Sequence, residues 1–178
     1  PIPSRGLGDV YKRQGLISFS IKTVFFINLI VAKVIWMSND KIKVAILGIG
    51  NCASSFVQGI EHYSNSDNED GLISDVIGGY KVSDIEVVAA YDINSLKVGK
   101  DLSEAIFAEP NNTMKFSDVP KTGVTVQPGV INDGVGKFVK DIINTSPDSD
   151  NFEKSLRESG AEILINLLPV GSDEAVKY

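Results

Sequence analysis

The chain has 178 residues, 43% of them hydrophobic and 22% charged, and this composition predicts a single soluble globular domain. Five of the 17 basic residues but only one of the 23 acidic residues precede Met37, so the chain after that point carries a net charge of −10. This acidic body argues against nucleic acid or an anionic membrane as a partner, because both require a basic face.

The first 36 residues contain one strongly apolar run, residues 24–32, which lies between two lysines. A membrane-spanning helix needs about 20 apolar residues, so this run is too short to span a bilayer. A secretory signal would use Lys12 and Arg13 as its basic region, but no small-x-small cleavage site follows the run. A membrane anchor made from residues 15–36 stays an alternative, which cell fractionation would test.

Residues 9–14 (Asp-Val-Tyr-Lys-Arg-Gln) look like the in-frame translation of a transposon end used in preparing sequencing libraries. Met37 looks like a natural start just ahead of the first predicted strand. We therefore expect residues 1–36 to be a non-native leader, adapter-derived and translated from upstream DNA. The domain is expected over residues 37–178.

The first predicted strand, residues 42–47, is β-branched and nearly free of charge, and it runs into Gly48-Ile49-Gly50 and a helix at 51–63. In a dinucleotide-binding turn the first glycine allows the tight bend, and the second lets backbone N–H groups approach a phosphate. The small Ala53 lets the helix pack on its strand. A plain strand-to-helix turn with glycines is the alternative, because a lone Gly-x-Gly-x-x-Ala motif is a weak signal.

Strands and helices alternate along the rest of the domain. A polar loop (64–71) and an ordered insertion (72–83) precede a strand at 85–92. Helices are expected at 95–107, 138–143, 152–159 and from 172 onward, with strands at 124–126 and 162–168 and loops at 110–113 and 128–136. This alternation predicts an α/β fold, a doubly wound and mostly parallel sheet of the Rossmann type.

Ligands of such sheets lie beyond the carboxyl ends of the strands, where three informative segments are expected to meet. These are the turn 48–53, Asp92 at the end of the second strand, and residues 168–172 after the last one. Asp92 is a candidate for hydrogen bonds to an adenosine ribose, which would favour NAD over its 2′-phosphorylated form. It lies 42 residues beyond Gly50 rather than the usual 20 or so, an excess that the insertion explains, and a helix N-cap is its alternative role.

The chain has one cysteine and one histidine, so neither an internal disulfide nor a metal site of nitrogen and sulfur ligands is expected. Cys52 begins the first helix, but the lone His62 lies at the far end of that helix and cannot serve as its base. We expect Cys52 to be a small packing residue that contributes its backbone to phosphate binding. Nothing indicates an oxidising compartment, and a cytoplasmic location is expected.

Several ordered motifs resemble the inositol-3-phosphate synthases, specifically the shorter type of archaea and many bacteria. The resemblance covers residues 41–178 and is carried by 48–59, Val88-Ala89-Ala90-Tyr91-Asp92, 97–107, Asn111-Asn112-Thr113, Asp133-Gly134-Val135-Gly136-Lys137 and Leu168-Pro169-Val170-Gly171-Ser172.

The resemblance implies an NAD-dependent isomerase of inositol and inositol-phospholipid biosynthesis. It would convert glucose 6-phosphate into myo-inositol 3-phosphate (1L-myo-inositol 1-phosphate) by transient oxidation at C5, an aldol between C6 and C1, and reduction. It places the pyrophosphate on Gly48, Ile49, Gly50, Asn51, Cys52 and Ala53, the adenosine ribose on Asp92, and the nicotinamide near Leu168, Pro169, Val170, Gly171 and Ser172.

The family's lysine-rich catalytic segment belongs to a second domain that also forms a homotetramer, and the chain stops at Tyr178 before reaching it. We therefore assign no catalytic residue and no metal ligand here, expect the fragment to be inactive, and leave a divalent cation to the full-length enzyme. The alternatives are a non-enzymatic NAD-binding module and a generic NAD-dependent oxidoreductase. The downstream reading frame distinguishes the module from the synthase.

Overall fold

The computed structural model describes residues 41–66, 70–132, 141–147, 149, 151–169, 172 and 174. The chain divides into two compact units, residues 1–40 and 41–178, and every described residue belongs to the second. The expected leader and its boundary after residue 36 lie outside the described residues. No helix among the described residues is long and apolar enough to cross a membrane.

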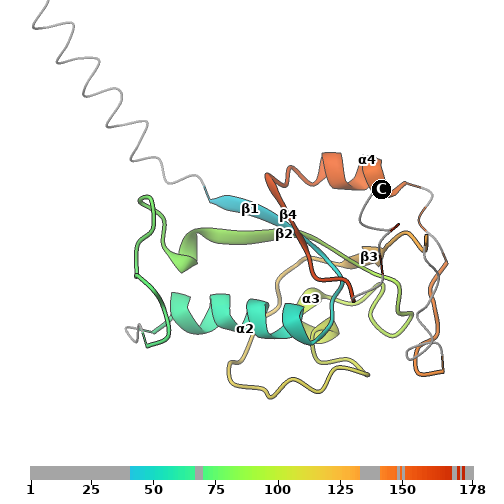
Figure 1. Ribbon diagram of the computed structural model, residues 1–178, viewed down its shortest axis with the longest axis horizontal. Coiled ribbons are helices and arrows are strands. Elements are labelled where there is room, and N and C mark those ends of the chain that lie inside the picture. Colours follow the sequence, from blue (N-terminus) through green and yellow to red (C-terminus); the bar gives the residue numbers. More distant parts are fainter. Residues whose placement is uncertain are drawn as a thin grey trace, which may run out of the picture. The chain divides into compact units, whose positions relative to one another are not determined.

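Among the described residues, four parallel strands form one sheet in the order β3-β2-β1-β4. They are β1 (Ile42–Leu47), β2 (Ile85–Asp92), β3 (Val126–Pro128) and β4 (Ile163–Asn166). The bounds of β1 and β2 agree with those expected from the sequence. The predicted α/β fold with a parallel sheet between helices is therefore confirmed (Figure 1).

The two faces of the sheet carry alternate residues of its central strands, as the two-residue period of a strand requires. Val44 and Ile46 of β1 pack with Ala53 and Val57 of the helix α2 (Asn51–Ser64) in the larger buried cluster. Ala45 belongs to a second cluster, which the helix α4 (Phe152–Glu158) covers from the opposite face. Figure 1 shows α2 and α4 on opposite sides of the sheet.

The buried face of α2 is more polar than its apolar pattern predicts. Val57 is buried as expected, but Phe56 and Ile60 are only half-buried, while Ser54 and Gln58 are fully enclosed. The Gln58 amide explains this, because its oxygen accepts the N–H of Phe116 at 2.8 Å and its nitrogen lies 3.3 Å from the Met114 carbonyl oxygen. One face of the helix therefore fixes a loop as well as the sheet.

The prediction of a helix over residues 95–107 is wrong for most of that range. Residues 95–99 form turns, and only α3 (Leu102–Ala105) is helical. Gly99 has a φ of +86°, which a right-handed helix cannot contain, and its N–H donates to the Val126 carbonyl oxygen at 2.8 Å. The backbone at this point pairs with the edge strand, and α3 begins only after Asp101 caps it by accepting the Ser103 N–H.

The short strand expected at 124–126 begins later, as β3 at Val126, and includes Pro128, which had been expected to open the next loop. Proline is tolerated there because the N–H of alternate β3 residues points away from β2. Val126 uses this outward N–H to donate to the Lys100 carbonyl oxygen at 2.9 Å, and Pro128, two residues further on, needs no N–H toward β2. Thr125 instead forms an isolated bridge with Asp101.

Within residues 72–83, where the sequence predicts an ordered insertion, Ile77 and Tyr80 bridge around Gly78-Gly79, and a 3-10 helix (Val82–Asp84) follows. The helix expected at 152–159 is confirmed as α4, and β4 is shorter than the predicted 162–168. The helix expected at 138–143 is described only from 141, where the chain turns, and the one from 172 only at Ser172 and Glu174.

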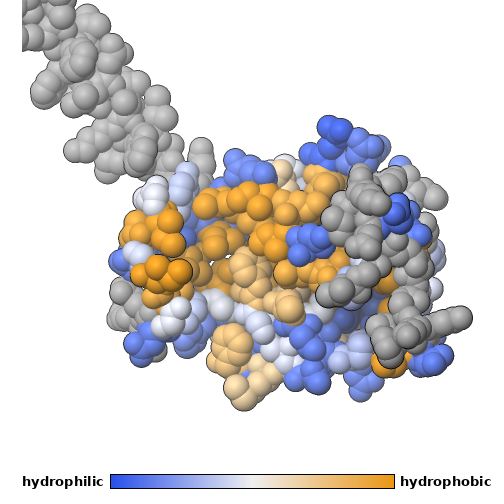
Figure 2. Space-filling model, viewed as in Figure 1, coloured by the Kyte–Doolittle hydropathy of each residue, from blue (hydrophilic) through white to orange (hydrophobic). Residues whose placement is uncertain are grey.

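Strand β4 lies at the edge of the described sheet, and its apolar side chains are partly open to solvent. Ile163 and Leu164 are 48% and 45% exposed. Figure 2 shows the apolar surface over β4 and a second apolar area at the left of the view, over the segment between α2 and β2. Ile73 and Ile77 are the most exposed apolar residues of that segment.

Candidate functional site

The turn after β1 begins with Gly48, a position that only glycine fits. Its φ is +90°, and a Cβ atom there would lie 3.0 Å from the Leu167 carbonyl oxygen and 3.3 Å from the Leu168 side chain. Its N–H donates to the Tyr91 carbonyl oxygen at 2.8 Å, so the turn remains attached to β2. The first glycine therefore serves the tight bend, as the sequence predicts.

Gly50 is the N-cap of α2 and has an ordinary conformation, with φ −89° and ψ −161°. Apart from Gly50 itself and its two neighbours in the chain, no described atom lies within 4 Å of the point where its Cβ would be. Neither strain nor crowding within the described chain therefore requires a glycine. The missing side chain leaves open space in front of a helix that has no side-chain cap and no acidic residue in its first turn. Such a helix N-terminus offers unpaired N–H groups and partial positive charge to an anion.

The next three residues divide between packing and exposure. Ala53 is fully buried against the sheet, which is the packing predicted for the third position of the motif. The packing expected of Cys52 is wrong, because its side chain is exposed. The Asn51 side chain donates to the Asn112 amide oxygen at 2.8 Å and accepts the Asn112 N–H at 2.9 Å. Thr113 adds a hydroxyl bond to Asn51. The loop at 111–113 is thereby fixed beside the glycine turn.

Asp92 lies at the carboxyl end of β2, as predicted, and its carboxylate makes three contacts within the chain. One oxygen accepts the Ile49 N–H at 2.7 Å and lies 4.0 Å from the Lys97 ammonium, and the other accepts the Asn94 N–H at 2.8 Å. The alternative role expected for Asp92 was a helix N-cap. Its bond to the Asn94 N–H resembles such a cap, but the residues that follow form a turn and not a helix. Each oxygen keeps a second lone pair, so the ribose role stays a prediction.

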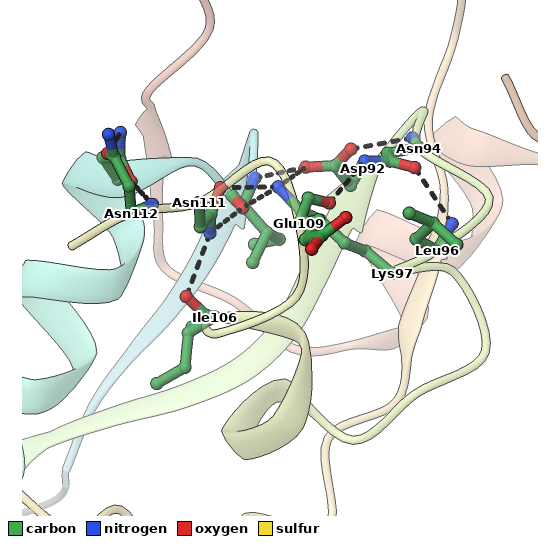
Figure 3. A network of polar contacts seen from close by, with 10 residues as sticks. Asp92, Asn94, Leu96, Lys97, Ile106, Glu109, Asn111 and Asn112 are labelled. Atoms are coloured by element: carbon green, nitrogen blue, oxygen red, sulfur yellow. Dashed lines mark hydrogen bonds and ion pairs between the residues drawn. The ribbon is translucent and has the colours of Figure 1, made fainter. Parts of the chain in front are cut away.

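Lys97 and Asn111 lie at the centre of the site, and sequence reasoning did not single out either one. The Lys97 ammonium donates to the Ile49 carbonyl oxygen at 2.7 Å and to the Asn111 amide oxygen at 2.8 Å. Figure 3 shows these side chains converging with Asp92 on the turn. Burial lowers the pKa of Lys97, and the nearby charge of Asp92 partly opposes that shift. The sequence feature that could have identified both residues is their place in segments 97–107 and 111–113, which resemble a known family.

The third predicted segment reaches the same place at its beginning. The Leu167 N–H donates to the Leu47 carbonyl oxygen at 2.8 Å, and Leu168 is half-buried next to Gly48. Pro169 is exposed, and its carbonyl oxygen accepts the Ser172 N–H at 3.3 Å. Val170 and Gly171 lie outside the described residues. The structure thus brings together the turn, Asp92 and the start of the third segment.

Cations and metal ligands at the site are few. Across the described part of the chain, no group of three or more histidine, cysteine, aspartate or glutamate side chains is placed to hold a metal ion. What the arrangement offers is an uncapped helix N-terminus behind an open glycine, with an acidic residue at the end of the neighbouring strand. These features fit a phosphate-containing nucleotide.

No family model matches the chain, but individual relatives do. The inositol-3-phosphate synthase of Mycolicibacterium smegmatis is 49% identical over 143 residues, which are 78% of this chain and 39% of that protein. Those of Mycobacterium tuberculosis (strain H37Rv) and Corynebacterium glutamicum are 46% and 43% identical over 146 residues each, and each is covered to 40% of its length. The chain therefore spans about two fifths of the length of these curated relatives.

Two solved structures resemble this one. The crystal structure of Ari2 has a TM-score of 0.59 and 34% sequence identity, over 76% of this chain and 40% of that one. A myo-inositol-1-phosphate synthase-related protein from Thermotoga maritima has a TM-score of 0.53 over 71% of this chain and 34% of that one. At 22% identity, the second likeness concerns the fold alone.

Proposed function

We propose that the chain belongs with the inositol-3-phosphate synthases, which it matches over about two fifths of their length, and that it supplies the NAD-binding portion of such an enzyme. The single observation that carries this proposal is Gly50. Its missing side chain leaves open space at the uncapped N-terminus of α2, although nothing in the described chain requires a glycine there. A bound pyrophosphate would explain the glycine, because the absence of a side chain lets the phosphate approach the backbone N–H groups closely.

The proposed cofactor is NAD, with its pyrophosphate on the backbone of Gly50, Asn51 and Cys52. Gly48 and Ala53 act indirectly, because the first shapes the turn and the second packs α2 on the sheet. Ile49, also expected at the pyrophosphate, is indirect as well, because its N–H donates to Asp92 and its side chain is buried. Asp92 accepts the hydroxyl groups of the adenosine ribose with its remaining lone pairs. Its negative charge disfavours a 2′-phosphate at the same place, so we propose NAD rather than NADP.

The nicotinamide end would lie near Leu168, whose side chain adjoins Gly48 on the β4 side of the turn. Bound there, NAD supplies a reversible hydride acceptor for the sugar carbon that is oxidised and later reduced. The contribution of the described residues is to bind and orient the cofactor. We assign them no proton transfer and no contact with the sugar.

We propose glucose 6-phosphate as the substrate of the whole enzyme and isomerisation to myo-inositol 3-phosphate as its reaction. The relatives' names support the reaction, while the chain matches only about 40% of their length. A homotetrameric assembly, a divalent cation in the full-length enzyme and a cytoplasmic location belong to the same proposal. The 178-residue chain alone is proposed to bind NAD without turning over glucose 6-phosphate.

Isothermal titration of the 178-residue chain with NAD tests the proposal, using Gly50→Val as the informative variant. A valine at residue 50 meets no described atom within 4 Å of its Cβ, so the fold should survive while the pyrophosphate is excluded. Gly59→Ala is the matched control, because Gly59 lies in the same helix and its Cβ position is equally open. Loss of binding in Gly50→Val alone supports the site, and equal affinity in all three proteins contradicts it.

A further inference from the structure

Lys97 is a buried lysine in the turn after β2, and its exposed fraction is only 3%. Burying an ammonium group is costly unless it is paired and hydrogen-bonded. Here the Nζ atom donates to the Ile49 carbonyl oxygen at 2.7 Å and to Asn111 at 2.8 Å, and lies 4.0 Å from an Asp92 carboxylate oxygen (Figure 3). An ion pair alone does not explain this arrangement, because its shortest contact is to the glycine turn rather than to the carboxylate.

Ile49 is held by side chains at both of its backbone polar groups. Its N–H donates to Asp92 at 2.7 Å, and its carbonyl oxygen accepts from Lys97 and, at 3.0 Å, from Asn111. Its own side chain is fully buried in the main apolar cluster. The residue between the two glycines therefore cannot rotate without breaking several hydrogen bonds.

The orientation of Ile49 decides where the N–H of Gly50 points, because both groups belong to one peptide plane. The Ile49–Gly50 bond is trans, and in a trans peptide the C=O and N–H bonds point in opposite directions. With the carbonyl oxygen held by Lys97, the Gly50 N–H points away from the Lys97 ammonium. The Cβ position of Gly50 is open as well, and the proposed pyrophosphate lies in front of both.

We infer that Lys97 is a positioning residue for cofactor binding: its buried ammonium, together with Asn111, holds the Ile49 carbonyl so that the Gly50 N–H faces the pyrophosphate. The inference rests on the proposed function, because it concerns the same site. Lys97 itself does not touch the cofactor. In its absence only Asn111 holds the Ile49 carbonyl oxygen, so the 49–50 peptide is less firmly oriented, and the energy needed to hold it in place is subtracted from binding.

The test compares NAD affinities of the wild-type chain with those of Lys97→Met, Asn111→Ala and Lys100→Met, each at a temperature where the variant is folded. Methionine keeps the apolar stem of Lys97 and removes its charged donor. Removal of a hydrogen bond to a charged group predicts an NAD affinity about ten- to a hundredfold weaker. Asn111→Ala removes a neutral donor, and about two- to tenfold is expected. Lys100 is an exposed lysine three residues further on, and Lys100→Met should bind like the wild type.

A second readout separates positioning from mere stabilisation. The amide proton of Gly50, observed by NMR without cofactor, should change its chemical shift in Lys97→Met and Asn111→Ala but not in Lys100→Met. Unchanged NAD affinity in a folded Lys97→Met chain overturns the inference. If that variant does not fold, unchanged affinity in Asn111→Ala overturns it instead. Failure of the proposed function has another signature, because then the wild type fails to bind NAD or Gly50→Val binds it normally.

Discussion

The carboxylate of Asp92 accepts the backbone N–H of Ile49 at 2.7 Å, which joins the end of β2 to the glycine turn after β1. These two residues are 43 positions apart in the chain, and the parallel pairing of β1 with β2 brings them together. The acid at the strand end therefore has a role in shaping the turn as well as its proposed role in binding ribose. Substitutions at Asp92 must be interpreted with both roles in mind.

Asp92→Asn is predicted to narrow the preference of the chain for NAD over NADP. The wild-type carboxylate repels a 2′-phosphate, whereas a neutral amide does not. NAD affinity should fall as well, because the charge beside Lys97 is lost. Titration of wild type and variant with both dinucleotides gives the ratio directly. An unchanged ratio would show that Asp92 does not lie beside the ribose.

Gly48→Ala is predicted to destabilise the fold by about 1–3 kcal/mol, because the φ of +90° is strained for any other residue. The added methyl group would also lie only 3.0 Å from the Leu167 carbonyl oxygen. Urea unfolding followed by circular dichroism measures the effect, and Gly50→Val is the contrast because its site is open. Equal stability of Gly48→Ala and wild type would mean that the turn is not as tight as described.

Gly59→Ala is predicted to stabilise the chain by about 0.5–1 kcal/mol. Gly59 lies in the middle of α2 and has no described neighbour within 4 Å of its Cβ position, so alanine brings its higher helix propensity at no steric cost. A higher urea midpoint with an unchanged slope is the expected result. A lower midpoint would indicate a neighbour that needs the glycine.

Asp101 is predicted to stabilise the folded chain at neutral pH and to lose this effect in acid. Burial raises the pKa of Asp101, but hydrogen bonds from Ser103 and Thr122 outweigh this and hold the pKa well below its usual value. The folded state thus favours the carboxylate, and this contribution is fully present above the ordinary carboxyl pKa of about 4 and is lost as the pH falls through the folded-state pKa.

Asp101→Asn should consequently reduce stability at neutral pH by about 1 kcal/mol, and the difference from wild type should shrink in acid. Urea unfolding at a series of pH values from neutral downward measures it. Asp118→Asn is the comparison, since Lys115 also lowers the pKa of Asp118 but the carboxylate is exposed, where such a pair contributes little to stability. A gap between wild type and Asp101→Asn that is constant across the pH series would contradict this explanation.

The parts of the fold that the sequence predicted well are those decided by local pattern. Strands β1 and β2 are mainly apolar runs, each with a charged residue at its second position, and their predicted bounds are confirmed. The helix at 95–107 failed for the opposite reason: its residues fit a helix locally, but Gly99 and its neighbours pair with the edge strand instead. Long-range backbone pairing of that kind leaves no periodic signal.

The candidate site divides in the same way. The glycines of the turn and Asp92 were predictable, because each has a known purpose at the end of a parallel strand. The role of Lys97 was not predictable. A lysine between Leu96 and Val98 gives no indication that its ammonium is buried against the backbone of Ile49, a residue 48 positions earlier in the chain. Only the folded chain shows that contact.

The most direct test of the central claim is an NMR titration of the isotopically labelled 178-residue chain with NAD. The account predicts saturable shifts of the amide signals of Gly50, Asn51, Cys52 and Ala53, with further shifts around Asp92 and Leu168, and their loss in Gly50→Val. Shifts confined to other surfaces, or no change on saturation with NAD, would contradict the assignment of the glycine turn as the cofactor site.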